Sequence, residues 1–337
     1  MICCIPAAAS SRPFLSICIP TWNRSAELAA QLVGLIPHIS DGIEIVVVDN
    51  GSDDDTLDMV RRIASDNPKA RLTLWSNEVN LGADANYLRA LELGQGEWLW
   101  LLGDDDLINH SHIPLLREKL EACRAGIAFF YHHRLKLYAG KEPVISSAEF
   151  FNSRHDDMSY WIHKIGFVAI RRDAAQRTFK KAYAQGIGTL HAHSIVILGM
   201  IDDRQDIAVF DMPSLFGDFA SGIVEAPRWG ALHGVLGAWR ATEAGLASSP
   251  RQVREREIRT RTREIYRTVI HQMAASQKVQ AKDLLWVLRK VSLPHKLIVS
   301  SLYILSKMPL SLSGKMTRMM LRSRGRQTRH STDYEEY

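Results

Sequence analysis

The chain has 337 residues, 46% of them apolar, and a formal net charge of +5. This length and apolar content exclude a disordered chain and predict either one large domain with an appendage or two modest domains. The four cysteines show neither metal-ligand pairing nor the spacing of a disulfide framework, which indicates a reducing compartment. The first fourteen residues contain two prolines and lack a basic start, so we do not expect a secretory signal peptide.

Apolar runs and helical patterns alternate along the first third of the chain. Four runs have the composition of buried strands: 15–20, 43–48, 71–75 and 97–102. Helical periodicity follows the first three, through Leu28, Leu32 and Leu35, through Leu57, Val60 and Ile63, and over 83–93. This alternation predicts an α/β fold with a mostly parallel sheet covered by helices on both faces.

The strand expected over 97–102 ends in Gly103 and three consecutive carboxylates, Asp104, Asp105 and Asp106. The carboxyl ends of parallel strands meet at one edge of the sheet, where divalent cations and phosphates are commonly held. The triplet therefore predicts a metal and phosphate site. The alternative is a solvated acidic loop in which one aspartate caps the next helix.

Two other strand ends carry residues suited to a nucleotide. Asp49 directly follows an apolar run, where its carboxylate can accept hydrogen bonds from a base or ribose or can cap a turn. Gly82 precedes the helix expected over 83–93, where the backbone can approach a phosphate closely and unpaired amides favour anions. Each signal is weak alone, and the spacing among the loops gives them weight.

Four segments in this order and spacing resemble the nucleotide-binding half of family 2 glycosyltransferases. They are the segments 15–24, 44–52, 80–86 and 100–106. The resemblance covers about residues 14 to 200. It implies a GT-A fold, a nucleotide-diphosphate sugar donor, a divalent metal that bridges the diphosphate, and inversion at the anomeric carbon.

The resemblance also assigns roles to individual residues. Those expected to bind the nucleotide-sugar are Pro20, Thr21, Asn23, Asp49, Gly82, Asn86 and Asp104. Asp105 is expected to ligate the metal with Asp106 beside it, and an all-oxygen site with diphosphate fits Mn²⁺ or Mg²⁺. Gly103 departs from the usual family pattern, which has an aspartate there, but we do not take it as a sign of lost activity.

An inverting transfer needs a general base that takes the proton from the acceptor hydroxyl. Where family members usually have an aspartate, the segment 186–196 has no carboxylate. His193 and His191 are the candidates, with His193 ahead, because a neutral imidazole is a competent base; Asp106 is also a catalytic candidate. The alternative is that the histidines cap a helix or line the acceptor groove. Asp156 and Asp157 are more typical of helix caps.

The last part of the chain differs in charge and pattern. We expect a GT-A catalytic domain over 14–220, divided into a nucleotide-sugar half (14–110) and an acceptor half (111–220), and a helical region over 221–337. Between 284 and 332 there are ten lysines and arginines and no acidic residue, and the apolar run at 297–305 is too short to span a bilayer. This tail predicts an interfacial anchor at an anionic membrane surface. The alternative is an ordinary helical subdomain; nucleic acid is not expected as a partner.

The sequence as a whole predicts an inverting, metal-dependent glycosyltransferase. We expect it in the cytoplasm at the inner face of the cell membrane. Its expected acceptor is a polyprenyl-diphosphate-linked glycan in the assembly of a bacterial surface polysaccharide such as O-antigen, with a protein or soluble glycan as the alternative acceptor. A catalytically silent GT-A module that binds nucleotide or partner enzymes is the alternative function.

Overall fold

The computed structural model describes residues 1–5, 12–40, 42–131, 142–152, 162–212, 215, 231–255 and 257. The chain divides into two compact units, one of Met1–Gly217 with Arg240–Arg254 and one of Asp218–Trp239 with Glu255–Tyr337. The candidate site lies in the first unit. Asp156, Asp157 and the basic tail over 284–332 lie outside the described residues, so the expectations placed on them stay predictions.

A nine-stranded mixed sheet forms the centre of the first unit, in the order β1-β4-β3-β2-β5-β8-β6-β9-β7. Its strands are β1 (Ile2–Ile5), β2 (Leu15–Thr21), β3 (Ile43–Asp49), β4 (Leu72–Ser76), β5 (Trp98–Leu101), β6 (Ile127–Tyr131), β7 (Val144–Ile145), β8 (Val168–Arg171) and β9 (Ile207–Asp211). Strands β4, β3, β2 and β5 run parallel, as do β6 and β9. Strands β1, β8 and β7 are antiparallel to their neighbours.

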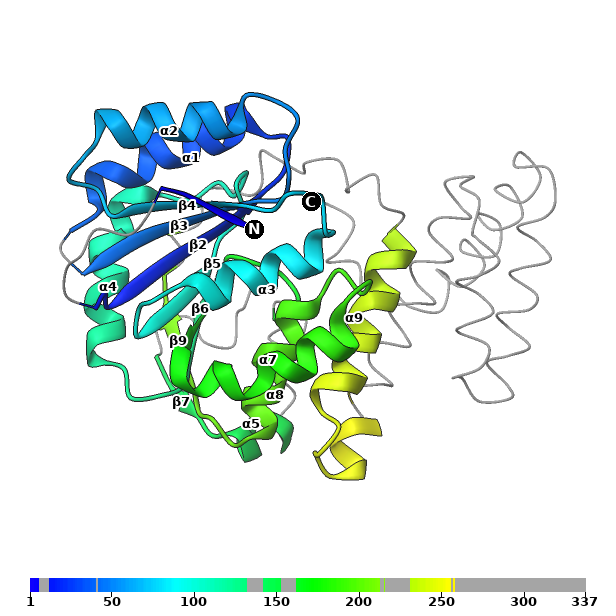
Figure 1. The fold of residues 1–337 in the computed structure, drawn as a ribbon. Helices are drawn as coiled ribbons and strands as arrows, with labels where there is room; N and C mark the ends of the chain where they lie inside the picture. The colour runs from blue at the N-terminus through cyan, green and yellow to red at the C-terminus, as the bar shows by residue number, and fades with distance from the viewer. Residues whose placement is uncertain are drawn as a thin grey trace, which may run out of the picture. The chain divides into compact units, whose positions relative to one another are not determined.

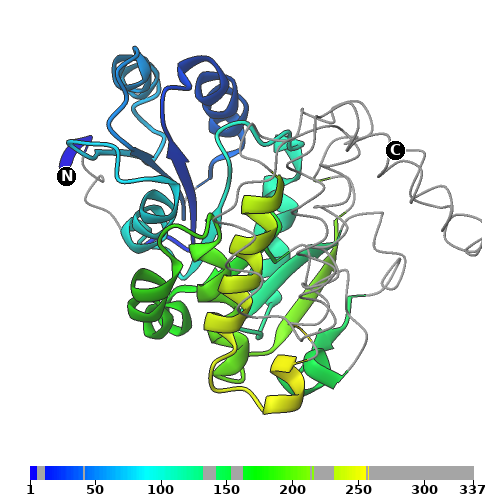
Figure 2. The same ribbon diagram turned by 90° about the vertical axis from the view of Figure 1, so that its right-hand side faces the viewer.

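Helices cover both faces of the parallel strands. The described helices are α1 (Ser25–Leu35), α2 (Thr56–Asp66), α3 (Ala83–Leu93), α4 (Ile113–Ala122), α5 (Ser147–Asn152), α7 (Arg172–Gly186), α8 (Ala192–Asp202) and α9 (Ala231–Gly245), with 3₁₀ turns at Ile36–His38 and His110–His112. Helices α1 and α2 lie together on one face and α3 lies on the other (Figure 1). Helices α7 and α8 pack against α3, and the second view shows the same arrangement (Figure 2).

The first half of the sheet agrees with the prediction, and the second half adds β6, β7 and β9, which the sequence pattern did not reveal. All four expected strands and all three expected helices are present, and α3 has the expected bounds, Ala83–Leu93. The short strand β1, which pairs with the edge strand β4, was not expected. Strand β8 is antiparallel to β5, so the sheet is mixed beyond the region where strands and helices alternate.

The amino-terminal end of the parallel strands is closed by a buried polar cluster. The Glu44 carboxylate accepts a hydrogen bond from Ser16 Oγ at 2.5 Å and one from the backbone N–H of Gln95 at 2.7 Å. Ser16 Oγ in turn accepts from the N–H of Gly96 at 2.8 Å. These buried polar groups therefore satisfy one another at that end of the sheet.

Candidate active site

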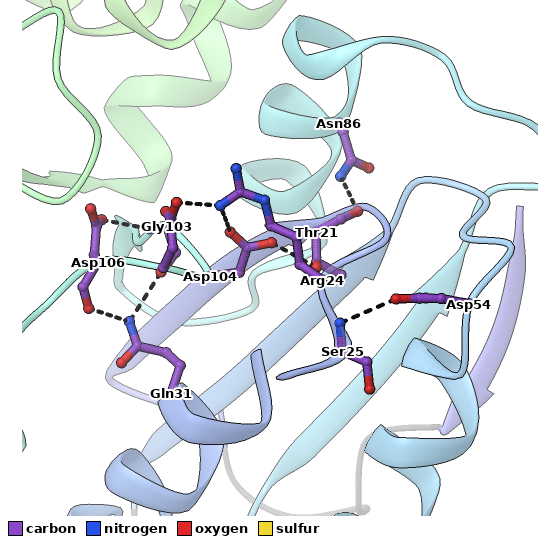
Figure 3. A network of polar contacts seen from close by, with 10 residues as sticks. Thr21, Arg24, Ser25, Gln31, Asp54, Asn86, Gly103, Asp104 and Asp106 are labelled. Carbon is purple, nitrogen blue, oxygen red and sulfur yellow. Dashed lines mark hydrogen bonds and ion pairs between the residues drawn. The ribbon is translucent and has the colours of Figure 1, made fainter. Parts of the chain in front are cut away.

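Four loops meet at the carboxyl edge of the parallel strands β2, β3, β4 and β5. Residues of two of these loops form a compact polar network (Figure 3). Asp104, at the end of β5, is 7% exposed and accepts a hydrogen bond from Thr21 Oγ1 at 2.7 Å. Burial raises the pKa of Asp104 to about 6, although this hydrogen bond and the charge of Arg24 act in the opposite direction.

Arg24 joins two members of the carboxylate cluster, the buried Asp104 and the exposed Asp105. Its Nη1 lies 3.3 Å from Asp104 Oδ1 and also forms an ion pair with Asp105 Oδ2. The side chains of Arg24 and Asp105 are 43% and 47% exposed, so both are accessible to a ligand. The sequence analysis did not assign Arg24 to the site, although its position directly after Thr21, Trp22 and Asn23 could have indicated it.

Asp106 points the other way and closes the turn that carries the cluster. Its Oδ2 accepts a hydrogen bond from the N–H of Gly103 at 2.7 Å. A Cβ at Gly103 would lie 2.9 Å from that oxygen, so a larger residue there would require the Asp106 side chain to shift. Burial, with the charges of Asp105 and Asp104, raises the pKa of Asp106 to about 7. In this conformation Asp106 serves the turn, and its expected metal and catalytic roles stay predictions.

Gln31 of α1 holds both ends of this turn. Its Nε2 donates to the carbonyl oxygens of Gly103 and Asp106, each at 3.0 Å, and its Oε1 lies 2.7 Å from His110 Nε2. Gln31 is 4% exposed, so these bonds are shielded from water. The sequence analysis missed this residue; a polar residue on the apolar face of an expected helix is the signal that could have found it.

Replacing Gln31 by Leu is expected to destabilise the protein by about 1–3 kcal/mol, because two buried carbonyls lose their donor. The looser turn should also weaken metal-dependent nucleotide binding several-fold. Urea unfolding and calorimetry measure the two effects. Gln95→Leu is the control, because Gln95 is exposed and its side-chain amide donates to the carbonyl of Leu93 at 3.1 Å. Equal stability of the two variants would contradict the prediction.

The loop after β3 is organised by Asp49. Its carboxylate is fully buried and accepts hydrogen bonds from the N–H groups of Gly51 and Ser52, from Ser76 Oγ at 2.9 Å and from Ser52 Oγ. The structure therefore places Asp49 at the expected edge of the sheet and gives it a turn-closing role there. Its expected contact with the base or ribose stays a prediction.

Asn23 and Pro20 position the loop after β2. The N–H of Asn23 donates to Ser52 Oγ and its side-chain oxygen accepts from the N–H of Asp53, both at 2.8 Å. Asn23 adopts a φ of 51°, a left-handed conformation that asparagine tolerates better than most residues. Pro20 lies on β2 beyond Cys18, where pairing with β5 ends, so its missing N–H costs no bond on that side.

An asparagine network joins the loops after β3 and β4. Asn77 Nδ2 donates to Asn50 Oδ1 at 3.0 Å and to Asn86 Oδ1 at 3.1 Å, and Asn86 Nδ2 donates to the carbonyl of Val48 at 2.9 Å. Asn86 thus braces the end of β3, and its expected donor contact stays a prediction. Asn50 and Asn77 were missed, although each lies two positions beyond the end of an expected strand and directly follows the observed β3 or β4.

Gly82 begins α3 and borders open space. Its φ is 85°, and a Cβ built on it would meet no heavy atom within 4 Å among the described residues. Glycine is needed there for the backbone conformation rather than for lack of room. The first N–H groups of α3 follow directly, so the position fits the expected phosphate contact, which the structure does not test.

Asp84, in the first turn of α3, holds the loop before α8. Its Oδ2 accepts from the N–H groups of Gly188 and Leu190 at 2.9 and 2.8 Å, and its Oδ1 accepts from that of Ala192 at 2.9 Å. Asp84 is 4% exposed, and burial raises the pKa of its carboxyl although these donors favour the charged form. This residue connects the donor-side helix to the segment that carries His191 and His193.

The two candidate histidines have different surroundings. His193 is 4% exposed, lies edge-on against Tyr87 with ring centroids 5.6 Å apart, and lines a small cavity with Leu91 and Ile197. Burial, with the neighbouring His191, lowers the pKa of His193 to about 3, so its ring is neutral at physiological pH. His191 is half-buried, and its Nδ1 lies 3.2 Å from the carbonyl oxygen of His163.

The burial of His193 predicts a pH-dependent stability. The folded protein keeps this ring neutral down to about pH 3, whereas in the unfolded chain it gains a proton near pH 6.5. The folded state therefore keeps its full free energy of unfolding above about pH 6.5. As the pH falls below this value, that free energy decreases, because only the unfolded chain binds the proton. Between pH 7.5 and 5.5, the wild type should lose about 1 kcal/mol more unfolding free energy than His193→Leu. Urea unfolding at both pH values checks this, and identical losses would contradict it.

The carboxylates also decide whether a divalent cation fits. Among the described ranges, no three His, Cys, Asp or Glu side chains converge as a metal cage. Mg²⁺ and Mn²⁺ need no such cage in sites where one or two carboxylates, water and substrate phosphates complete the shell. Asp104 and Asp105 already share a cation, the Arg24 guanidinium, so their oxygens are close enough to bind one positive group. The donor set fits the expected metal.

Comparison with solved structures defines the class of the fold. S. aureus TarS (residues 1–349) in complex with UDP-GlcNAc superposes with a TM-score of 0.59 at 15% identity, covering 93% of this chain and 92% of that one. The mannosyltransferase PcManGT from Pyrobaculum calidifontis, in complex with GDP-Man and Mn²⁺, gives 0.52 at 15% identity, covering 97% and 90%. The chain has the GT-A fold of these glycosyltransferases, as predicted.

Residues 16–179 match the family model described as glycosyl transferase family 2, so the chain carries a family 2 glycosyltransferase domain, as predicted. The abequosyltransferase RfbV of Salmonella typhimurium is 32% identical over 111 residues, 32% of this chain and 33% of the relative. The GalNAc(5)-diNAcBac-PP-undecaprenol beta-1,3-glucosyltransferase of Campylobacter jejuni is 29% identical over 107 residues, 32% and 34%. The chain matches about a third of the length of each of these relatives.

Proposed function

We propose that the protein is a glycosyltransferase that moves a sugar from a nucleotide-diphosphate donor to an acceptor hydroxyl with inversion. The observation that carries the proposal is the pair Asp104 and Asp105 at the end of β5, placed beside Thr21 and Arg24 at the end of β2. The family 2 domain and the GT-A fold support it. The proposed donor-binding residues are Pro20, Thr21, Asn23, Asp49, Gly82, Asn86 and Asp104.

Asp105, with Asp104 beside it, would hold Mn²⁺ or Mg²⁺ together with the donor diphosphate. A bound divalent cation offsets the charge that develops on the leaving diphosphate. The protein groups around the pair keep it in place: Thr21 donates to Asp104, and Gln31 and Asp106 fix the turn that presents both carboxylates. The GDP-Man and Mn²⁺ complex of the mannosyltransferase with the same fold is consistent with this assignment.

His191 is the general base that we favour. Its Nδ1 faces a carbonyl oxygen, which requires the proton on Nδ1 and leaves Nε2 as the basic nitrogen. His193 remains in the set of candidates, but its burial and its pKa of about 3 argue against proton uptake in this conformation. Replacement of each histidine by Ala, with turnover and donor affinity measured separately, distinguishes the two.

The proposed acceptor is a polyprenyl-diphosphate-linked glycan in O-antigen or capsule-type assembly. The name of the Campylobacter relative, which acts on a PP-undecaprenol-linked glycan, supports this class of acceptor. None of the helices in the described ranges is both long and apolar enough to cross a bilayer. We propose that the protein acts at the inner face of the cell membrane and that the basic tail, which lies outside those ranges, binds the anionic surface.

Calorimetric titration with a panel of nucleotide-diphosphate sugars, first with Mn²⁺ and then with EDTA, tests the function. We expect one donor to bind with Mn²⁺ and to lose most of its affinity in EDTA. Slow hydrolysis of that donor would separate an enzyme from a silent GT-A module. Absence of binding by every donor in both conditions would contradict the proposal.

A further inference from the structure

We infer that Arg24 is an internal counter-cation that competes with divalent metal for Asp104 and Asp105, so that metal enters the site together with a nucleotide diphosphate and not alone. This inference rests on the proposed function, because it concerns the order in which that function's ligands are bound. It assigns to Arg24 a role in the coupling between metal and donor.

The contacts of Arg24 resemble those of a bound cation. A single nitrogen, Nη1, lies 3.3 Å from Asp104 Oδ1 and pairs with Asp105 Oδ2 (Figure 3). Arginine usually meets one carboxylate with two nitrogens in a fork. Here one nitrogen lies between the two carboxylates that would also hold a divalent cation.

The backbone of Arg24 is fixed, and its side chain is partly exposed. Asn23 bonds to the loop at Ser52 and Asp53, and the N–H of Ser25 donates to Asp54 Oδ2 at 3.3 Å. The Arg24 side chain as a whole is 43% exposed. Arg24 is also the N-cap of α1, where the helix dipole disfavours a cation unless anions are near. The guanidinium therefore needs negative partners, and a diphosphate would replace the carboxylates in that role.

Charge balance connects metal and nucleotide. The ionised carboxylates of Asp104 and Asp105 and the Arg24 guanidinium sum to a single negative charge, and a divalent cation alone would turn the sum of these three groups positive. The two cations would then repel each other at close range. A diphosphate brings at least two negative charges, so it can accept the guanidinium while the metal takes the carboxylates. Each ligand should therefore raise the affinity for the other.

The experiment measures Mn²⁺ binding to the nucleotide-free protein, by the loss of the free Mn²⁺ signal in electron paramagnetic resonance. Arg24→Gln should bind Mn²⁺ about tenfold more tightly than wild type, since a competing ion pair is gone. Mn²⁺ alone should also raise the melting temperature of this variant more than that of wild type. Addition of UDP or GDP should increase the Mn²⁺ affinity of wild type more than that of the variant.

Two further variants make the comparison specific. Arg61→Gln is the matched control, because Arg61 pairs with the exposed Asp58 on α2 at 2.8 Å, and its Mn²⁺ affinity should equal that of wild type. Arg24→Lys keeps the charge and should bind Mn²⁺ more weakly than Arg24→Gln. If Arg24→Gln does not fold, Arg24→Lys provides the test. The lysine side chain is shorter, so it should pair less closely with the two carboxylates, and the affinity for Mn²⁺ should rise above that of wild type.

The outcomes separate this inference from the proposed function. Equal Mn²⁺ affinity of wild type, Arg24→Gln and Arg24→Lys overturns the inference, even where UDP or GDP binds with Mn²⁺ as the function requires. A second result also overturns the inference: nucleotide binds to wild type equally well in EDTA, and this binding is lost in Arg24→Gln. Arg24 would then itself be the cation that binds the diphosphate, with no metal involved. Failure of every nucleotide to bind contradicts the function, whereas the Mn²⁺ comparison needs no nucleotide.

Discussion

Asp105→Asn is expected to weaken Mn²⁺-dependent nucleotide binding by roughly 100-fold or more, beyond the loss typical of groups that only orient a ligand. The amide has one oxygen and no charge, so it cannot hold a divalent cation against water as a carboxylate does. Turnover should fall at least as far, because the leaving diphosphate loses its counter-charge. Calorimetry with UDP or GDP, with Mn²⁺ and with EDTA, measures the binding loss directly.

The position of Asp105 makes this variant informative. Its side chain is 47% exposed, so an isosteric amide should leave the fold and the melting temperature nearly unchanged. Asp104 would be a poorer choice, since it is buried and accepts the Thr21 hydrogen bond. Asp58→Asn, on the exposed side of α2, is the control for a lost surface carboxylate. Nucleotide binding at wild-type strength in Asp105→Asn would remove Asp105 from the metal site.

The sequence predicted the donor half of the fold well because its signals are local. A buried parallel strand shows a continuous apolar run, and β3, Ile43–Asp49, is buried at every position. The polar residues at the strand ends are equally visible, so the place of Asp104, Asp105 and Asp106 followed from the strand before them. The strand β8 could not be placed in the same way, because the direction of pairing between β5 and β8 depends on contacts far apart in the chain.

The partners of the site residues were not predictable from the sequence. Gln31 meets Gly103 and Asp106 across 72 and 75 positions, and Thr21 meets Asp104 across 83. Such pairs depend on the packing of α1 against the strand ends, which no local pattern encodes. The burial of His193 could have been predicted locally, because the sequence of α8 is apolar on all sides of the helix, as is typical of a buried helix. In the structure, every residue from Ala192 to Ile201 is buried.

Asp84 shows how the two halves of the domain are joined at the site. Its carboxylate receives three backbone N–H groups from the segment between α7 and α8, over separations of 104 to 108 positions. Leu190 in this segment has a φ of 65°, a conformation that a residue other than glycine holds only with fixed partners, whereas Gly188 adopts its φ of 82° readily. One buried carboxylate therefore determines the path of the chain into α8.

Asp84→Ala is accordingly expected to lower the free energy of unfolding by about 3 kcal/mol, because it leaves buried N–H groups without an acceptor. Asp84→Asn should lie in between, since its amide keeps one acceptor oxygen but turns an NH₂ group toward backbone donors. Urea unfolding at pH 7.5 gives the values. Asp58→Ala, also an aspartate in the first turn of a helix but exposed, should change stability by less than about 0.5 kcal/mol.

The same substitution separates donor binding from proton transfer. The segment that Asp84 holds carries His191, whereas the carboxylates proposed to hold the metal are fixed by Thr21 and Gln31. At temperatures where Asp84→Asn is folded, kcat should therefore fall by about tenfold or more while the affinity for the donor with Mn²⁺ changes little. Loss of donor affinity with unchanged kcat would show that Asp84 supports donor binding and not proton transfer. Wild-type stability of Asp84→Ala would show that Asp84 has no structural role.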